Sequence, residues 1–215
     1  MKMKTTKITL ILFALLTITY SCKKKKIAPT LTLIGESSIT LCLGDVFTDP
    51  GAESIDAYDD DISADIESIG SVNVDSVGSY TIEYTSTDKN DNVSVLSRTV
   101  NVVVCVDNLL GDYSVDDDCG SQLADTHTIS AGANNNEIII DNIVTLAGGQ
   151  VTGTLSGSTI TIPQQDFSIT VGTFTLSGSG VVNSNATEIV FDYTWENSTP
   201  LVGGNGTCTA TYTKQ

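Results

Sequence analysis

The sequence predicts an all-β protein, and three observations support this fold class. After residue 29, short segments rich in Val, Ile, Thr and Tyr alternate apolar and polar side chains, as half-buried strands do. Gly, Asn, Asp and Ser separate these segments at intervals of about 8–12 residues, a spacing typical of β-sandwiches and β-barrels. The periodicity of an amphipathic helix is almost absent from this part of the chain.

The N-terminus has the layout of an export signal. Three lysines precede an apolar run at residues 8–20, and Ser21 and Cys22 follow it. A basic start, a short apolar middle and a small residue before the cleavage point are typical of a secretory signal. The run is shorter than the roughly 20 residues that cross a bilayer as a helix, which disfavours a transmembrane anchor.

Ser21 and Cys22 resemble the lipobox of bacterial lipoproteins, in which the cysteine is acylated and becomes the first mature residue. The lysine run at 23–26 resembles that of Bacteroidetes lipoproteins. The resemblance implies a signal peptide at 1–21, a lipidated Cys22 with a basic tether at 22–29, and anchoring in the outer membrane. Thr19 departs from the usual branched apolar residue, so a cleaved signal without lipid is the alternative.

The location of the protein on the outer membrane stays open, on either the periplasmic or the cell-surface face. Export to the surface in this group of lipoproteins tends to follow an acidic stretch after the cysteine, and this chain has a basic one.

The charge balance excludes nucleic acid as a partner. The formal net charge is −16, and beyond the tether only Lys89, Arg98 and Lys214 are basic. Nucleic-acid binding depends on Lys and Arg side chains that neutralise phosphates. A surface this acidic attracts cations instead.

The first region after the tether predicts a β-sandwich. Its strands are expected at residues 30–34, 38–43, 52–56, 62–69, 80–86 and 93–106. The Asp-Pro-Gly sequence at 49–51 predicts a turn, because proline presets its own φ and glycine tolerates a positive one. Tyr80, Ile82 and Tyr84 alternate along one strand and share a face, and residues 88–92 form a polar hairpin tip.

Several motifs of this region resemble a bacterial immunoglobulin-like (Ig-like) module, a domain type that also occurs in a pesticidal crystal toxin and in many surface proteins. The motifs are Gly44-Asp45, Asp49-Pro50-Gly51-Ala52, Asp59-Asp60-Asp61-Ile62, Gly78-Ser79-Tyr80 and Arg98-Thr99-Val100. The resemblance implies an Ig-like β-sandwich over residues 30–106.

The second region, residues 107–215, predicts an antiparallel up-and-down meander. Its strands are expected at residues 110–115, 125–130, 137–143, 151–156, 159–162, 167–177, 188–195 and 207–213. Short turns at Gly148-Gly149 and Ser156-Gly157 favour hairpin connections. The sequences at 110–113, 159–165 and 208–212 resemble a lipocalin-like β-meander domain, frequent at the C-termini of Bacteroidetes lipoproteins. The resemblance implies a half-barrel or barrel.

Four cysteines follow Cys22, at positions 42, 105, 119 and 208. Disulfides persist in exported proteins, and four cysteines allow three pairings. We favour Cys42–Cys105 and Cys119–Cys208, because each pair then stays within one predicted domain. Four buried thiols are the alternative. A structural zinc site is disfavoured, since the chain has no Cys-x-x-Cys motif.

Two acidic loops are the candidate cation site. In an Ig-like sandwich the loops at 56–61 and 88–92 lie at the same pole. Calcium takes six to eight oxygen ligands from carboxylates, amides and carbonyls. The candidate ligands are Asp56, Asp59, Asp60, Asp61, Asp88, Asn90, Asp91 and Asn92. The alternative is a solvated acidic pole and no cofactor at all.

Aromatic residues and the single histidine are the remaining candidates. Phe191, Tyr193 and Trp195 alternate along one predicted strand, so they either pack in the core or form a ligand face that stacks on sugar rings. His127 lies in a predicted strand and is expected at the surface or half-buried. We expect this single histidine to be a structural strand residue and not part of a Ser-His-Asp triad, and a metal site of several histidines cannot be assembled, so we predict no enzyme.

The sequence thus predicts a non-catalytic envelope lipoprotein that acts as a binding or adhesion module for a glycan or protein partner. One alternative is a structural spacer or scaffold in an outer-membrane complex. Another is a lipocalin-like carrier or inhibitor that binds a small ligand; a fold alone does not decide between these functions.

Overall fold

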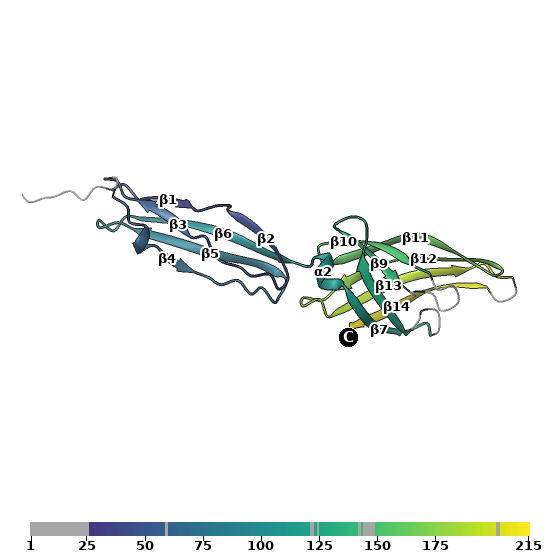
Figure 1. The fold of residues 1–215 in the computed structure, drawn as a ribbon. Helices are drawn as coiled ribbons and strands as arrows, with labels where there is room; N and C mark the ends of the chain where they lie inside the picture. The colour runs from purple at the N-terminus through teal and green to yellow at the C-terminus, as the bar shows by residue number, and fades with distance from the viewer. Residues whose placement is uncertain are drawn as a thin grey trace, which may run out of the picture. The chain divides into compact units, whose positions relative to one another are not determined.

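A computed structural model describes residues 26–58, 60–120, 123, 125–141, 143, 149–200 and 203–215. The predicted signal peptide, the lipidation site Cys22, Asp59 and the predicted turn residue Gly148 lie outside these residues. Nearly all regular structure is β (Figure 1). In the part of the chain that the structure describes, no helix is long and apolar enough to span a membrane.

Two sheets form the N-terminal part of the fold and confirm the predicted Ig-like sandwich (Figure 1). The first sheet pairs β1 (Thr30–Leu33) antiparallel with β3 (Ala52–Ile55). The second sheet has the order β2-β6-β5-β4, formed by β2 (Ser38–Cys42), β6 (Val93–Val103), β5 (Gly78–Thr87) and β4 (Glu67–Ile69). The chain therefore changes sheets between β1 and β2, and β2 runs parallel to β6.

A buried ion pair explains two of the sequence motifs. The Arg98 side chain is fully buried in β6, and its Nη1 donates to Asp49 Oδ1 at 2.6 Å. Arg98 Nε also donates to the Glu36 carbonyl at 3.1 Å. Asp49 begins the Asp-Pro-Gly turn, in which Gly51 has a φ of +81°. The pair therefore fixes this turn, and a buried charge of this kind is strongly destabilising when its partner is removed.

The alternation on β5 and β6 produces the core of the sandwich, and Ile82 and Tyr84 share a face as predicted. Ile82, Tyr84 and Ser86 point inward from β5, and Val100 and Val102 from β6. The Ser54 and Ser86 hydroxyls lie 2.6 Å apart, so these buried polar groups satisfy each other.

The strand predicted at 62–69 is wrong in its first half. Residues Ser63–Asp65 form the 3-10 helix η1, and only Glu67–Ile69 is strand. The Ser63 N–H donates to Asp61 Oδ1 at 2.9 Å. Such a local side-chain contact offers the backbone an alternative to a strand ladder.

Eight strands form a closed antiparallel barrel in the order β10-β11-β12-β13-β14-β7-β8-β9. The short helix α2 (Val106–Leu109) precedes it. The strands are β7 (Gly111–Asp117), β8 (Thr126–Ala131), β9 (Glu137–Asp141), β10 (Val151–Ser156), β11 (Thr159–Ile169), β12 (Gly172–Val182), β13 (Glu188–Asn197) and β14 (Gly204–Lys214). Each strand pairs with its neighbour in sequence, and β14 pairs with β7 to close the ring. The predicted meander is confirmed, and it is a full barrel. The domain boundary after residue 106 stays a prediction.

The strand predicted at 167–177 is wrong, because it runs across a hairpin turn. Strand β11 passes Pro163 through a register shift between Ile162 and Gln165 and continues to Ile169. A bulge is one of the few places where a sheet tolerates a proline, which has no N–H to donate. The turn then ends at Gly172, whose φ is +122°.

The barrel interior is filled by side chains. Gly178 lies opposite Tyr193 and Gly180 opposite Phe191 across β12 and β13. The Phe191 ring packs over Gly180, and the Tyr193 backbone and Cβ lie against Gly178. A cavity between Leu123, Ile143, Phe191 and Tyr212 inside the barrel has a volume of about 10 Å³, which holds about one water molecule.

Candidate functional site

The predicted aromatic face on β13 points largely into the core. Phe191 and Tyr193 are 2% and 3% exposed, and Tyr193 donates its hydroxyl to Asp117 Oδ1 at 2.8 Å. Burial, together with this hydrogen bond, raises the pKa of Tyr193 well above its ordinary value. These two rings therefore cannot form an exposed ligand face. Trp195 is half-buried and borders a surface groove, but its indole lies on the inner face of β13 with these two rings.

Trp195 is held rigidly. Its ring stacks on Phe174, with centroids 6.1 Å apart and planes 5° apart. Its Nε1 donates to Cys208 Sγ at 3.2 Å. Gly206 lies directly opposite on β14, and a Cβ there would come within 2.9 Å of the indole nitrogen. The glycine therefore leaves space for the indole at this end of the barrel.

A polar groove of about 370 Å³ lies over β12, β13 and β14. Two rows of side chains cross these strands, as the strand register shows. They are Thr175, Glu196 and Asn205, and Ser177, Thr194 and Thr207. Gln164, from the bulge in β11, and Trp195 and Gly206 complete the lining. Strand alternation explains the rows, because these positions face away from the barrel interior.

The groove offers hydroxyl and amide groups and a single ionisable side chain, Glu196. Ser177 Oγ and Thr194 Oγ1 lie 2.9 Å apart, and Thr175 Oγ1 donates to Asp166 Oδ1 at 2.8 Å. Hydroxyls and amides both donate and accept hydrogen bonds. The groove can therefore bind a ligand that offers many donors and acceptors.

Sequence patterns did not identify this groove, because exposed Thr and Ser are typical of any solvent-facing strand. The signal that could have found it is the outward Thr and Ser positions on three consecutive strands next to the only tryptophan.

The two loops predicted to bind calcium use their buried carboxylates internally. Asp56 Oδ1 accepts the Tyr58 and Asp60 backbone N–H groups at 2.7 and 3.1 Å. Asp88 Oδ1 accepts those of Asn90 and Asn92 at 2.8 and 2.9 Å. These bonds fix the conformation of each loop.

The hydrogen bonds also set the acidity of Asp88. Desolvation raises its pKa, but the bonds from Asn92 and Asn90 outweigh this effect and leave the pKa below its ordinary value. The pKa of Asp61 is lowered as well, by hydrogen bonds from Ser63.

Lys89 supplies a cation to the same pole. Its Nζ lies 3.4 Å from Asp60 Oδ2 and 3.9 Å from Asp56 Oδ2, and 5.2 Å from the centroid of the Tyr58 ring. Asp61, Asp91 and the Asn90 and Asn92 amides belong to the two loops as predicted, but Asp59 is outside the described residues. Among the described residues, no group of three acidic, histidine or cysteine ligand atoms within 4.8 Å includes these loops. Calcium binding at this pole stays a prediction.

Both loops flank the point where the tether enters the sandwich. Thr30 pairs with Ile55, the residue before Asp56, and the Ser94 hydroxyl donates to the Pro29 carbonyl shortly after the 88–92 loop. The described chain, which starts at Lys26, therefore enters the sandwich beside the acidic pole.

Both predicted disulfides are present. Cys42 and Cys105 are joined with a Cα–Cα distance of 5.4 Å, and Cys119 and Cys208 with 5.7 Å. The second bond links the segment after β7 to β14, the two strands whose pairing closes the barrel.

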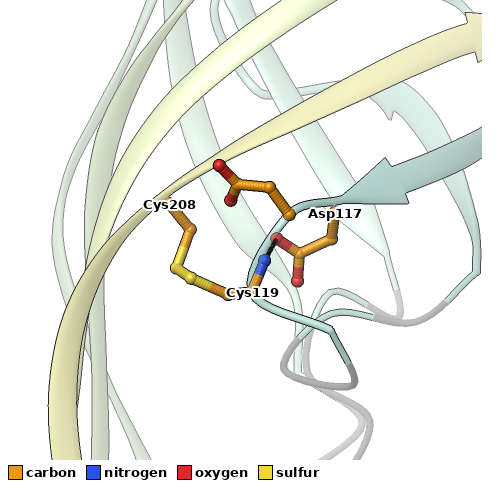
Figure 2. Close-up of side chains that lie close together, drawn as sticks. Asp117, Cys119 and Cys208 are labelled. Carbon is orange, nitrogen blue, oxygen red and sulfur yellow. Dashed lines mark hydrogen bonds between the residues drawn. A yellow bond between two sulfur atoms is a disulfide. The ribbon is translucent and has the colours of Figure 1, made fainter.

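Four candidate metal-ligating atoms also lie within 4.8 Å of one another, from Asp117, Asp118, Cys119 and Cys208. Figure 2 shows that the two sulfurs are joined in a disulfide, and that the Cys119 N–H donates to Asp117 Oδ1. A disulfide sulfur has no thiolate with which to coordinate a metal. Asp118 Oδ1 accepts the Thr209 N–H at 2.8 Å, so the cluster is a structural clamp and we assign no metal to it.

His127 is 1% exposed, and the expectation of a surface or half-buried position is wrong. It points inward between Thr126 and Thr128, and its Nδ1 lies 2.7 Å from the Tyr212 hydroxyl. Desolvation lowers its pKa from 6.5 to about 4. The ring is therefore neutral at physiological pH and belongs to the barrel core.

The architecture defines the class of protein: Ig-like sheets followed along the chain by a filled, lipocalin-like barrel. Residues 31–102 match the family model described as bacterial surface protein, Ig-like domain. The match covers about a third of the chain and confirms the Ig-like resemblance for that segment. No curated protein matches the chain.

Two solved structures are similar at low levels. A lipoprotein from Bacteroides thetaiotaomicron is 15% identical with a TM-score of 0.36, covering 86% of this chain and 100% of its own. The second, from Clostridium perfringens ZmpB, contains a carbohydrate-binding module in complex with GlcNAc, and INT domains. It is 13% identical with a TM-score of 0.30, covering 86% of this chain and 43% of its own. Similarities this low carry no argument about function.

Proposed function

We propose that this protein is a non-catalytic binding or adhesion protein of the bacterial envelope, held to the outer membrane through Cys22 and recognising a glycan or protein partner. The observation that carries the proposal is the polar groove on the outer wall of a barrel whose interior is filled. Binding then takes place on the outer surface of the barrel.

The groove supports binding rather than catalysis. Glu196 is the only ionisable side chain among its lining residues, which include no histidine, cysteine or lysine. General acid–base catalysis requires a positioned acid and base, and covalent catalysis requires an activated nucleophile. Neither arrangement is present among these residues.

Three observations support an envelope location. The N-terminus has the pattern of an export signal followed by a cysteine and a lysine run. Two disulfides suit the oxidising space outside the cytoplasm. The Ig-like segment matches a family described from bacterial surface proteins.

The lipocalin-like carrier is the weaker alternative, because ligand sites typically need about 300 Å³ or more and the described barrel cavity has about 10 Å³.

The proposed function is tested with residues 23–215 on a glycan array and in pull-down from envelope extracts. Saturable capture of a glycan or of a defined envelope protein supports a binding role. A blank array together with stoichiometric recovery in a multi-protein envelope complex supports the structural spacer. If neither a glycan nor an envelope protein is captured, the proposed function is wrong.

A further inference from the structure

We infer that Asp117 and Asp118 protect the exposed Cys119–Cys208 disulfide from anionic thiols, so that cationic thiols reduce it faster than anionic ones. The inference does not depend on what the protein binds. Three features support it: the exposure of one cysteine, the closeness of two carboxylates to both sulfurs, and the different surroundings of the other disulfide.

Cys119 is the point at which a reductant reaches this bond. Cys119 is exposed, whereas Cys208 is 2% exposed and accepts a hydrogen bond from Trp195 Nε1 at 3.2 Å. A thiolate therefore attacks Cys119 Sγ and forms a mixed disulfide with it, and the electron pair of the broken S–S bond leaves with Cys208 as a thiolate. A second thiolate then attacks the reagent's sulfur and releases Cys119 as a thiolate, together with the oxidised reagent. Exposed disulfides are ordinarily the labile ones.

Two carboxylates lie at this point of attack. One oxygen of Asp117, one of Asp118 and both sulfurs are all within 4.8 Å of one another, and Figure 2 shows the Asp117 side chain beside the bond. Asp117 Oδ1 accepts hydrogen bonds from the Tyr193 hydroxyl and the Cys119 N–H. Asp118 Oδ1 accepts the Thr209 N–H at 2.8 Å. These bonds keep both charges beside the disulfide when a reagent approaches.

The basic side chains beyond the tether are engaged elsewhere. They are Lys89, Arg98 and Lys214. Lys89 and Arg98 pair with acids of the sandwich, and the Lys214 Nζ donates to a carbonyl of helix α2 at 2.7 Å. An anionic reagent is therefore repelled by both carboxylates, and a cationic one is attracted. Two unit charges that each lie about 6 Å from a third in water alter a rate by about tenfold.

The Cys42–Cys105 bond provides a reference in the same molecule. Both of its cysteines are half-buried. Asp45 Oδ2 accepts the Cys42 N–H at 3.0 Å, but no carboxylate oxygen of the described residues lies within 4.8 Å of both sulfurs. The charge of a reagent should therefore matter less here. Since both bonds meet the same reagent, the ratio of their reduction rates cancels the intrinsic reactivity of each thiol.

The test measures the reduction of both bonds in residues 23–215 by cysteamine, which is cationic, by neutral 2-mercaptoethanol and by anionic mercaptoacetate. Samples are quenched with iodoacetamide at intervals, and mass spectrometry of the digested protein reports the free thiols of each pair. In about 0.1 M salt, we expect the rate at Cys119–Cys208 relative to Cys42–Cys105 to be on the order of tenfold higher with cysteamine than with mercaptoacetate. The neutral thiol should lie between them, and high salt should reduce the difference.

Two variants locate the source of this selectivity. Asp118→Asn removes one charge and keeps an Oδ1 acceptor for the Thr209 N–H, so the cysteamine-to-mercaptoacetate ratio should fall by about threefold. Glu188→Gln is the matched control, because it removes the same charge from an exposed position on β13. Glu188 lies five residues from Tyr193, the partner of Cys208 in the strand register, and five residues span roughly 17 Å. This distance exceeds the Debye length of about 10 Å, so the ratio should stay unchanged.

Each possible failure has a definite meaning. Equal relative rates with cysteamine and mercaptoacetate in the unmodified protein would overturn the inference, and so would an unchanged ratio in Asp118→Asn. A fall of the same size in Glu188→Gln would overturn it as well, because the net charge of the chain would then set the selectivity. The expected result would explain how an exposed disulfide stays closed in the presence of anionic thiols such as glutathione.

Discussion

At the scale of single residues, His127 is buried although its neighbours in the sequence are polar. His127 is flanked by threonines, and this polar context favours the surface in a sequence reading. The position of His127 in the strand alternation places its side chain inside the barrel instead. The centroid of its ring lies 5.1 Å from that of Tyr212. Tyr212 also contacts Phe191 at 4.9 Å, so the imidazole belongs to an aromatic cluster.

This burial predicts acid sensitivity. The unfolded chain binds a proton at His127 near pH 6.5, whereas the folded barrel does so near pH 4. The contribution of neutral His127 to stability is therefore fully present above pH 6.5 and is lost as the pH falls toward 4. At pH 5 the loss from this residue is about 2 kcal/mol. Urea denaturation followed by Trp195 fluorescence at pH 7 and pH 5 should show a smaller difference for His127→Gln. An equal difference in both proteins would contradict the assignment.

The aromatic residues of β13 show what a sequence can and cannot specify. Alternation correctly placed Phe191, Tyr193 and Trp195 on one face of a strand. It could not say whether that face was inside or outside, because the same pattern fits a core and a ligand platform. In the structure this face points inward, and Gly180 on β12 leaves room for the Phe191 ring.

At the scale of elements, β12 and β13 pair a glycine with a large aromatic residue, Gly180 with Phe191, and the aromatic ring fills space inside the barrel. Phe191→Ala is expected to destabilise the barrel by about 3–5 kcal/mol, because it leaves a cavity that Gly180 cannot fill. Val190→Ala on the outer face of the same strand should cost far less, since Val190 is 37% exposed. Denaturant midpoints read from Trp195 fluorescence would compare the two. Similar losses would mean that the ring does not fill the interior.

The Cys119–Cys208 disulfide joins the chain after β7 to β14, next to the strand pairing that closes the barrel. It closes a sequence separation of 89 residues, and removing such a cross-link typically costs about 2–4 kcal/mol. The double variant Cys119→Ser/Cys208→Ser should therefore unfold at lower urea than the parent. Reductant should lower the urea midpoint of the barrel, read from Trp195 fluorescence, more in the parent than in the variant, because the variant keeps only the Cys42–Cys105 bond of the sandwich. If the parent is equally stable in reductant, the bond does not secure the seam.

The acidic loops of the sandwich predict a competition between Lys89 and calcium. The Lys89 ammonium occupies the space between the carboxylates of Asp56 and Asp60, so calcium binding here requires its displacement. Millimolar calcium should raise the melting temperature of Lys89→Met more than that of the parent, by mass action on the folded state. The absence of a shift in both proteins would show that the loops bind no calcium.

At the scale of the whole molecule, the anchor can be tested independently of any ligand. Cys22→Ser should move the protein from the membrane fraction to the soluble fraction, because lysines alone give salt-sensitive attachment. A high-salt wash should leave the parent on the membrane. Retention of Cys22→Ser after that wash would contradict the lipid anchor.

Much of the fold followed from the sequence, because alternation and turn residues are local signals. The disulfide pairing also followed, once each pair was kept within one predicted domain. The misplaced hairpin near residue 170 was missed because a bulge carries β11 past Pro163 and moves the turn. The groove was missed for a different reason. Its residues extend from Gln164 to Thr207, and only the curvature of the barrel and the strand register bring them together.

The pairing of β7 with β14, which closes the barrel, affects how copies of the protein can associate when they are crowded on a membrane. An open sheet presents unpaired backbone groups that can recruit a neighbouring chain, and this is a common route to aggregation. Every strand of the barrel pairs with a strand on both sides over at least part of its length, which leaves few such edges among the described residues. The edges open to a neighbouring copy are then the short outer strands of the sandwich and the second half of β11, which pairs with β12.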